Sequence, residues 1–142
     1  MRKIFITFIS IFAFSQSVFA TCPLLDLIEH QGKTYGLAQW TYTPSNEKVS
    51  NWIRNLPWCS AIGQGRAVYS VKEGKVFLVK FRGCGSELPV SEAFSQAEPT
   101  LLAIWLTGKI DVAKGNCNGG WDPATEYFVV DKGQLVKFHQ SQ

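Results

Sequence analysis

The chain has 142 residues, of which 46% are apolar, and its 14 Lys and Arg against 11 Asp and Glu give a formal net charge of +3. That length suits a single domain with its own hydrophobic core. The sequence contains no long basic block, so neither nucleic acid nor an anionic membrane surface is an expected partner. Beyond the N-terminus, no apolar stretch is long and charge-free enough to span a membrane.

The first 20 residues predict an export signal. Arg2 and Lys3 precede an apolar stretch from Ile4 to Phe14, and the segment ends at the small residue Ala20, where a signal peptidase would cleave. An uncleaved membrane anchor is the alternative, but a bilayer span needs about 20 apolar residues and this stretch is shorter. We therefore expect residues 1–20 to be a signal peptide.

The mature protein would then be one β-rich domain, residues 21–142, located in the periplasm or secreted. It would hold 12 Lys and Arg against 11 Asp and Glu, a net charge of +1, and would not stay inserted in the membrane. A lipoprotein acylated at Cys22 is a second alternative. Thr21 argues against it, because a small Gly or Ala is expected immediately before an acylated cysteine.

All four cysteines lie in the mature part and predict two disulfide bonds, because an exported chain meets an oxidising compartment. If residues 67–82 form a hairpin, its two strands bring Cys59 and Cys84 toward each other at the open end of that hairpin. That leaves Cys22 to pair with Cys117. A zinc site is the alternative, but the chain has no Cys-x-x-Cys or Cys/His cluster to support it.

Two segments have helical character, residues 45–57 and residues 90–99. In the first, Ser45 or Asn46 can cap the helix, and Val49, Trp52 and Ile53 fall on one face. Each segment ends in a proline, which stops a helix.

Elsewhere β-branched and aromatic residues predict strands. Residues 33–43 favour a strand with a bulge at Gly36. The apolar run of residues 100–107 is more typical of a buried strand than of a helix, and it places Trp105 in the core.

Two stretches, residues 67–82 and 126–139, repeat one hairpin pattern. In each, an apolar run meets a charged triplet ending in glycine, and a second apolar run closes on Val-Lys-Phe. Gly74 and Gly133 would occupy the left-handed position of a three-residue connection. The similarity also extends upstream, from residues 61–66 to 103–109. Either the chain holds two related meander units, or turn physics permits few solutions.

The predicted fold is a compact, mainly antiparallel β-sheet domain of two similar hairpin or meander units, with one or two short helices and disulfide staples. The segments "CSAIGQGRAVYSVKEGKVFLVKF", "LLAIWLTGKIDVAKG" and "EYFVVDKGQLV" resemble a pattern in small bacterial β-meander proteins of unassigned function. This chain departs from that pattern by its export signal and its cysteines. The resemblance implies a β fold.

The sequence predicts no catalytic, metal or cofactor site. His30 lies at an expected element end and His139 in the C-terminal tail, where a side chain is poorly positioned. "GCGSE" around Ser86 lacks the form of a nucleophile elbow. Acidic residues are present, but sequence spacing does not show the cleft and separation that a carboxylate hydrolase requires.

Tryptophan is the unusual residue, with five in the chain. Trp52 and Trp105 are expected in the core. Trp58, and Trp121 beside Asp122, lie close to cysteines in loop-like sequence, where disulfides would hold the rings rigidly near the surface. We take Trp58, Trp121 and Asp122 as candidate binding residues, with packing against the disulfides as the alternative.

Three function classes follow. The first is a non-catalytic periplasmic binding protein, an immunity protein or inhibitor that blocks a toxin or hydrolase by protein–protein contact. The second is an envelope module that binds polysaccharide or peptidoglycan. The third is a small carboxylate-dependent hydrolase, which a fold alone never excludes.

Overall fold

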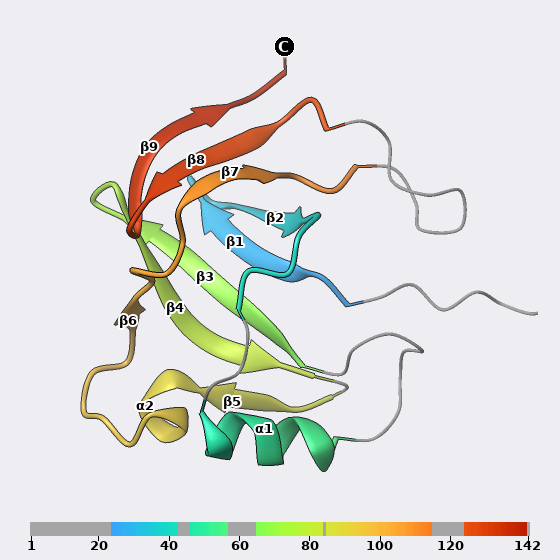
Figure 1. The fold of residues 1–142 in the computed structure, drawn as a ribbon, viewed down its shortest axis with the longest axis vertical. Coiled ribbons are helices and arrows are strands. Elements are labelled where there is room, and N and C mark those ends of the chain that lie inside the picture. The colour runs from blue at the N-terminus through green and yellow to red at the C-terminus, as the bar shows by residue number, and fades with distance from the viewer. Residues whose placement is uncertain (1–23, 43–45, 57–64, 84, 115–123, 142) are drawn as a thin grey trace, which may run out of the picture.

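A computed structural model of the protein describes residues 24–42, 46–56, 65–83, 85–114 and 124–141. This part of the chain forms nine strands and two short helices (Figure 1). In chain order they are β1 (Asp26–His30), β2 (Lys33–Leu37), α1 (Glu47–Arg54), β3 (Arg66–Lys72), β4 (Lys75–Arg82), β5 (Glu87–Pro89), α2 (Val90–Ala93), β6 (Leu101–Leu102), β7 (Gly108–Asp111), β8 (Tyr127–Asp131) and β9 (Gln134–His139).

The strands form one mixed sheet in the order β2-β1-β3-β4-β9-β8-β7, and β5 and β6 pair with β4 outside this path. The prediction of a mainly β fold with two short helices is confirmed. The prediction of an antiparallel sheet is incomplete, because β1 and β3 pair in parallel. The connection explains this pairing. β2 runs antiparallel to β1, and the segment containing α1 then leads the chain from β2, on one side of β1, to β3 on the other side, so that β3 starts at the same end as β1 and runs in the same direction.

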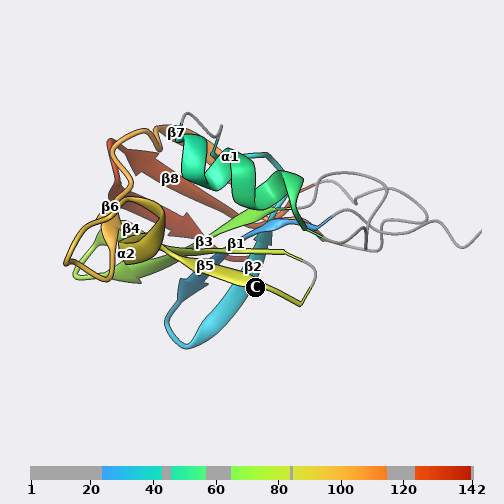
Figure 2. The ribbon, with the colours of Figure 1, turned by 90° about the horizontal axis from the view of Figure 1, so that it is seen from below.

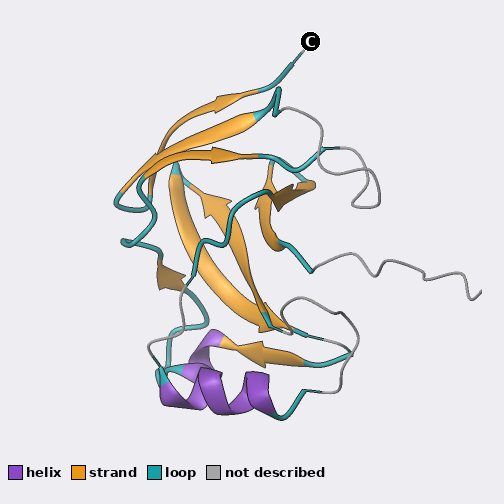
Figure 3. Cartoon of the chain, turned by 45° about the vertical axis from the view of Figure 1, so that its right-hand side comes forward, coloured by secondary structure: helices purple, strands orange, loops and turns teal. Residues whose placement is uncertain are grey.

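The sheet curls until its end strands β2 and β7 meet at one place (Figure 3). Leu37 and Val112 form an antiparallel bridge there. The Ala38 N–H donates to the Asp111 carbonyl at 2.9 Å, and the Ala113 N–H donates to the Gly36 carbonyl at 2.8 Å. We call this short junction the seam. It joins residues far apart in the chain and fixes the segment that follows β2 against β7.

The hydrophobic core lies inside the curl. Tyr69, Phe81 and Phe128 are its largest fully buried side chains. The β1–β2 and β8–β9 hairpins pack through rings, since His30 and Tyr35 lie 5.3 and 5.1 Å from the Phe138 ring centre. His30 therefore contributes to aromatic packing. The two helices and β5 lie at the end of the molecule opposite the β7–β9 meander (Figure 1). In the view from below they stand in front of the rest of the sheet (Figure 2).

Helix α1 forms where the sequence predicted it, and the Asn46 side chain caps it by accepting a hydrogen bond from the Val49 N–H at 3.1 Å. Val49 is fully buried in the core. The second predicted helix is only one turn, α2. Its N-cap Pro89 makes no side-chain cap bond, and Ser95 adopts a left-handed φ of 51°, which ends the helical path.

The two repeated hairpins form, but their turns are tighter than the sequence suggested. Only Glu73-Gly74 and Lys132-Gly133 lie between the paired strand ends. Both residues of each turn have positive φ, +49° and +70° in the first and +45° and +79° in the second. This is the pattern of a two-residue type I′ turn, whose twist matches that of the strands. Positive φ at both glycines is confirmed, and the predicted three-residue connection is wrong.

Each hairpin also carries a β-bulge inside the same tetrapeptide. The sequence Leu-Val-Lys-Phe occurs at residues 78–81 of β4 and at residues 135–138 of β9. Pairing with the neighbouring strand skips Val79 in the first hairpin and Val136 in the second. In a regular strand, side chains three residues apart point to opposite faces, so the bulge is what turns both Leu and Phe toward the core.

The two turns lie side by side. Lys75 of β4 pairs with Gln134 of β9. The Val76 N–H donates to the Gly133 carbonyl, and the Leu135 N–H donates to the Gly74 carbonyl, each at 2.8 Å. Beyond this point β4 continues along β6 and β5, while β9 leaves with β8. The second hairpin is therefore attached to the first mainly through the turns.

The strand expected over residues 100–107 is mostly a turn. Within this stretch only Leu101–Leu102 form a strand, β6, which pairs with β4. The chain then turns at Ile104 and Trp105 before β7. The strand expected over residues 33–43 ends at Leu37. It has no bulge at Gly36, which pairs in register with Leu27.

The four cysteines, Cys22, Cys59, Cys84 and Cys117, lie outside the described residues, as do the predicted signal peptide and the candidate binding residues Trp58, Trp121 and Asp122. The disulfide pairing and the export signal stay predictions.

Candidate functional site

One surface pocket brings together two tryptophans from distant parts of the chain. Its volume is about 280 Å³, and its walls are the segment after β2 and the segment from the turn before β7 into β7 itself. The lining residues are Gln39, Trp40, Thr41, Trp105, Leu106, Thr107, Lys109 and Ile110. The seam holds these walls together, and Gln39 adds to it because its Oε1 accepts a hydrogen bond from the Asp111 N–H at 2.9 Å.

Trp40 forms the more exposed wall, with 65% of the residue accessible to solvent. The Arg66 guanidinium carbon lies 4.4 Å from the centre of its ring, a cation–π arrangement. Arg66 is itself fixed, because its Nε donates to the Leu24 carbonyl at 2.8 Å. The indole therefore rests on a supported guanidinium while most of its surface stays open to solvent.

Trp105 forms the other wall and is 37% exposed, so the prediction that it belongs to the core is wrong. Its Nε1–H points toward the buried Tyr69 hydroxyl, at 3.4 Å. Its ring also meets Tyr42 edge to face, with centroids 5.5 Å apart. These contacts hold one edge of the indole, and the remainder lines the pocket.

Beneath the pocket lies Asp26, a carboxylate only 3% exposed. Its Oδ2 accepts hydrogen bonds from the Thr41 N–H and the Thr41 hydroxyl, both at 2.7 Å. Its Oδ1 accepts one from the Ala67 N–H at 2.9 Å. Three donors on one buried carboxylate satisfy it locally, as a buried charge requires.

Two arginines paired across β3 and β4, Arg66 and Arg82, lie near this carboxylate. Burial lowers the pKa of each guanidinium, and the charge of Asp26 acts in the opposite direction on both. Arg82 lowers the pKa of Arg66 further, because the two charges are alike. Asp26 thus compensates part of the cost of bringing these two cations together across β3 and β4.

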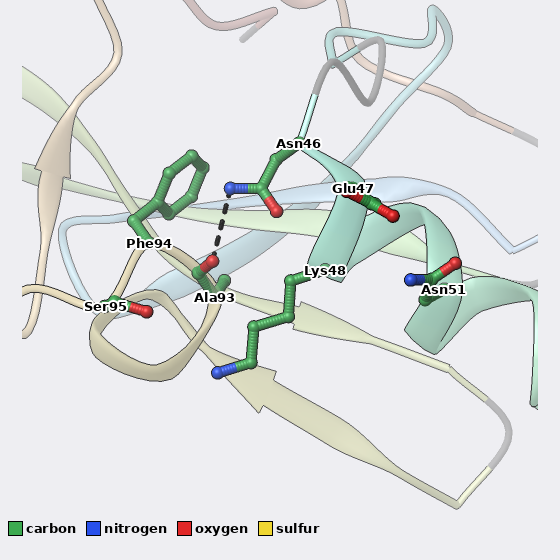
Figure 4. A pocket seen from close by; sticks show the side chains of 7 residues that line it. All are labelled: Asn46, Glu47, Lys48, Asn51, Ala93, Phe94 and Ser95. Atoms are coloured by element: carbon green, nitrogen blue, oxygen red, sulfur yellow. Dashed lines mark hydrogen bonds between the residues drawn. The ribbon is translucent and has the colours of Figure 1, made fainter.

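A second hollow, of about 460 Å³, lies between α1 and α2 (Figure 4). Figure 4 shows the Asn46 side chain reaching across to α2, where its Nδ2–H donates to the Ala93 carbonyl at 3.2 Å. Lys48 Nζ donates to the Glu92 carbonyl at 2.6 Å. Because these side chains are bonded to the opposite helix, we interpret this hollow as a crevice in the helix packing.

The tryptophans that sequence reasoning placed at a binding surface, Trp58 and Trp121, are outside the described residues together with Asp122. The sequence pattern does not single out Trp40 as a binding residue, because Trp40 lies inside the strand predicted over residues 33–43. A signal was available: the short run Ala38-Gln39-Trp40 does not continue the polar–apolar alternation of β2. Trp105 lies in a continuous apolar run, which predicts a buried strand and gives no sign of the turn at Ile104 and Trp105.

Within residues 24–42, 46–56, 65–83, 85–114 and 124–141, no three His, Cys, Asp or Glu side chains gather in a group that could hold a metal ion. No helix in these ranges has the length and apolar character needed to cross a bilayer. No protein-family model, curated protein or solved structure matches this chain.

Proposed function

We propose that this protein is an exported, periplasmic binding protein that recognises another protein through the Trp40–Trp105 pocket, as an immunity protein or inhibitor of a toxin or hydrolase does. The observation that carries the proposal is where the exposed apolar side chains gather. Among the described residues, four large apolar side chains are well exposed: Trp40, Ile104, Trp105 and Val136. The first and third line the pocket, and Ile104 stands beside Trp105 in the same turn.

Tryptophans that are anchored from below and open above are suited to protein interfaces. A ring that is already fixed loses little conformational entropy on binding, and Trp is among the residues most often found at the energetic centre of an interface. Arg66 supports Trp40, and Tyr69 and Tyr42 support Trp105. A pocket of this size accommodates one or two side chains of a partner.

A protein partner is favoured over a glycan by Ile104, which is 63% exposed. Aromatic faces serve both kinds of ligand, but an aliphatic side chain has no π face to stack on a sugar ring. Burying it against an apolar side chain of a protein removes apolar surface from water. Several pocket polar groups also already bond within the protein, as Gln39 does to Asp111 and Thr41 does to Asp26.

The proposal is tested by affinity capture from envelope extract with the mature protein as bait, followed by titration calorimetry with the purified captured protein. Trp40→Ala is expected to weaken this complex by at least about tenfold, since tryptophans at interface centres contribute 1–2 kcal/mol or more. Val136→Ala is the matched control, because Val136 is also 65% exposed but lies on β9, outside the pocket lining. Thermal melts of both variants should match the unchanged protein.

Inhibition is tested separately by measuring the activity of the captured partner with the unchanged protein and with Trp40→Ala. The wild-type protein should reduce that activity, whereas Trp40→Ala at the same concentration should not. Trp40-dependent binding to isolated peptidoglycan, without a protein partner, would contradict the proposal and assign the pocket to a glycan instead.

A further inference from the structure

A chain of hydrogen bonds runs from the pocket wall into the buried interior. Trp105 Nε1 lies 3.4 Å from the Tyr69 hydroxyl, and that hydroxyl lies 3.0 Å from Thr41 Oγ1. Thr41 Oγ1 in turn lies 2.7 Å from Asp26 Oδ2. The two ends of this chain differ in exposure: Trp105 lines the pocket, whereas Asp26 is buried.

The direction of this chain follows from counting protons. An indole N–H only donates, a carboxylate only accepts, and a hydroxyl has one proton to give. Thr41 lies closest to Asp26 and gives its proton to that carboxylate. Its oxygen then accepts from the Tyr69 hydroxyl, whose own oxygen accepts from Trp105. Burial raises the pKa of Tyr69 well above its ordinary value, so the hydroxyl keeps the proton that this arrangement requires.

The same carboxylate also holds the opposite wall. The Thr41 backbone N–H donates to Asp26 Oδ2, which fixes the residue that follows Trp40. The Ala67 N–H donates to Asp26 Oδ1, and the preceding residue, Arg66, lies under the Trp40 ring. Asp26 is therefore the common anchor of both tryptophans, although its hydrogen-bond donors are Thr41 and Ala67 and not the indoles.

We infer that Asp26 and Tyr69 are positioning residues, which set Trp105 and residues 39–41 in their binding geometry before the partner arrives. This inference rests on the proposed function of the pocket. Setting both rings in advance lowers the entropy lost on association, and that is where preorganised interfaces gain affinity.

The test is Tyr69→Phe, which removes one oxygen and keeps a ring that is fully buried. Tyr42→Phe is the matched control: Tyr42 also packs on Trp105, but within the described residues its hydroxyl makes no hydrogen bond to that indole. The first readout is hydrogen exchange of the Trp105 indole N–H by NMR, with the signal assigned from Trp105→Phe. Loss of the bond should speed this exchange by roughly tenfold in Tyr69→Phe and leave it unchanged in Tyr42→Phe.

The second readout is affinity for the captured protein, which Tyr69→Phe should weaken by roughly 3- to 10-fold and Tyr42→Phe should not change. Unchanged indole exchange in Tyr69→Phe, or equal effects of the two variants, would overturn the inference, as would faster exchange without weaker binding. If Tyr69→Phe does not fold, Thr41→Val is used instead: it removes the oxygen that orients the Tyr69 hydroxyl, so the Trp105 indole should exchange faster than in Tyr42→Phe, and an equal rate would overturn the inference.

The exchange measurement needs no partner, so it separates this inference from the proposed function. If Trp40→Ala binds normally, the proposed function fails, and with it the positioning role in binding. The hydrogen-bond chain would still stand or fall on the exchange rate of the Trp105 indole.

Discussion

The β3–β4 and β8–β9 hairpins share a tight turn ending in glycine, the tetrapeptide Leu-Val-Lys-Phe and a bulge at its valine, yet they occupy different places in the sheet. In the first, Phe81 is 1% exposed in the centre of the core. In the second, Phe138 is only partly buried, at the end where the β8–β9 hairpin packs on β1 and β2. Local sequence determines the turn and the bulge, whereas position in the sheet determines how much each contributes to stability.

The largest difference between the hairpins is expected at their matching phenylalanines. Phe81→Ala should lower the free energy of unfolding by about 3–5 kcal/mol, as truncating a fully buried ring does. Phe138→Ala should cost only about 1–2 kcal/mol, because its ring is partly exposed and loses less apolar contact. Urea denaturation of the two variants measures both values. Equal losses would mean that the second hairpin is as central to the core as the first.

The turn glycines should differ in the opposite sense. A Cβ at Gly74 would meet no atom within 4 Å, so Gly74→Ala should cost only the left-handed backbone strain, about 1 kcal/mol. A Cβ at Gly133 would lie 3.0 Å from the Ala103 carbonyl oxygen and force the backbone there to shift. Gly133→Ala should therefore cost about 2 kcal/mol or more. Thermal melts decide the order, and a milder effect at Gly133 would show that the neighbouring turn yields easily.

The smallest effects are expected at the charged residues that begin the two triplets. Lys72 and Asp131 are both exposed, and neither takes part in an ion pair within the described residues. Lys72→Ala and Asp131→Ala should each change the free energy of unfolding by less than about 0.5 kcal/mol. A loss at either residue comparable to that of its glycine would mean that charge, and not backbone conformation, specifies the turn.

The parts that sequence could predict are those determined by neighbouring residues. Asn46 caps α1 because its side chain reaches a backbone N–H three residues on, and Gly74 and Gly133 accept positive φ because they lack a Cβ. The bulges could also be predicted from the sequence, since Leu and Phe three residues apart in a strand cannot both face the core unless one residue is left unpaired.

The parts that sequence could not predict depend on distant residues. The parallel pairing of β1 with β3 and the seam between Leu37 and Val112 leave no local pattern. The turn at Ile104 and Trp105 contains none of the residues that usually mark turns. It is held instead by distant contacts, namely the β6 pairing with β4 and the hydrogen bond from the Gly133 N–H to the Leu106 carbonyl. Both walls of the pocket stand on such contacts, so sequence patterns alone did not locate it.

The seam also bears on how the protein folds. The seam joins residues near 37 to residues near 112, and such distant pairings form slowly because most of the chain must be ordered first. We expect the pocket walls, which the seam brings together, to assemble among the last parts of the structure. A chain cut short before β7 would then lack one wall of the pocket, so the binding proposed for the pocket would require a fully folded molecule.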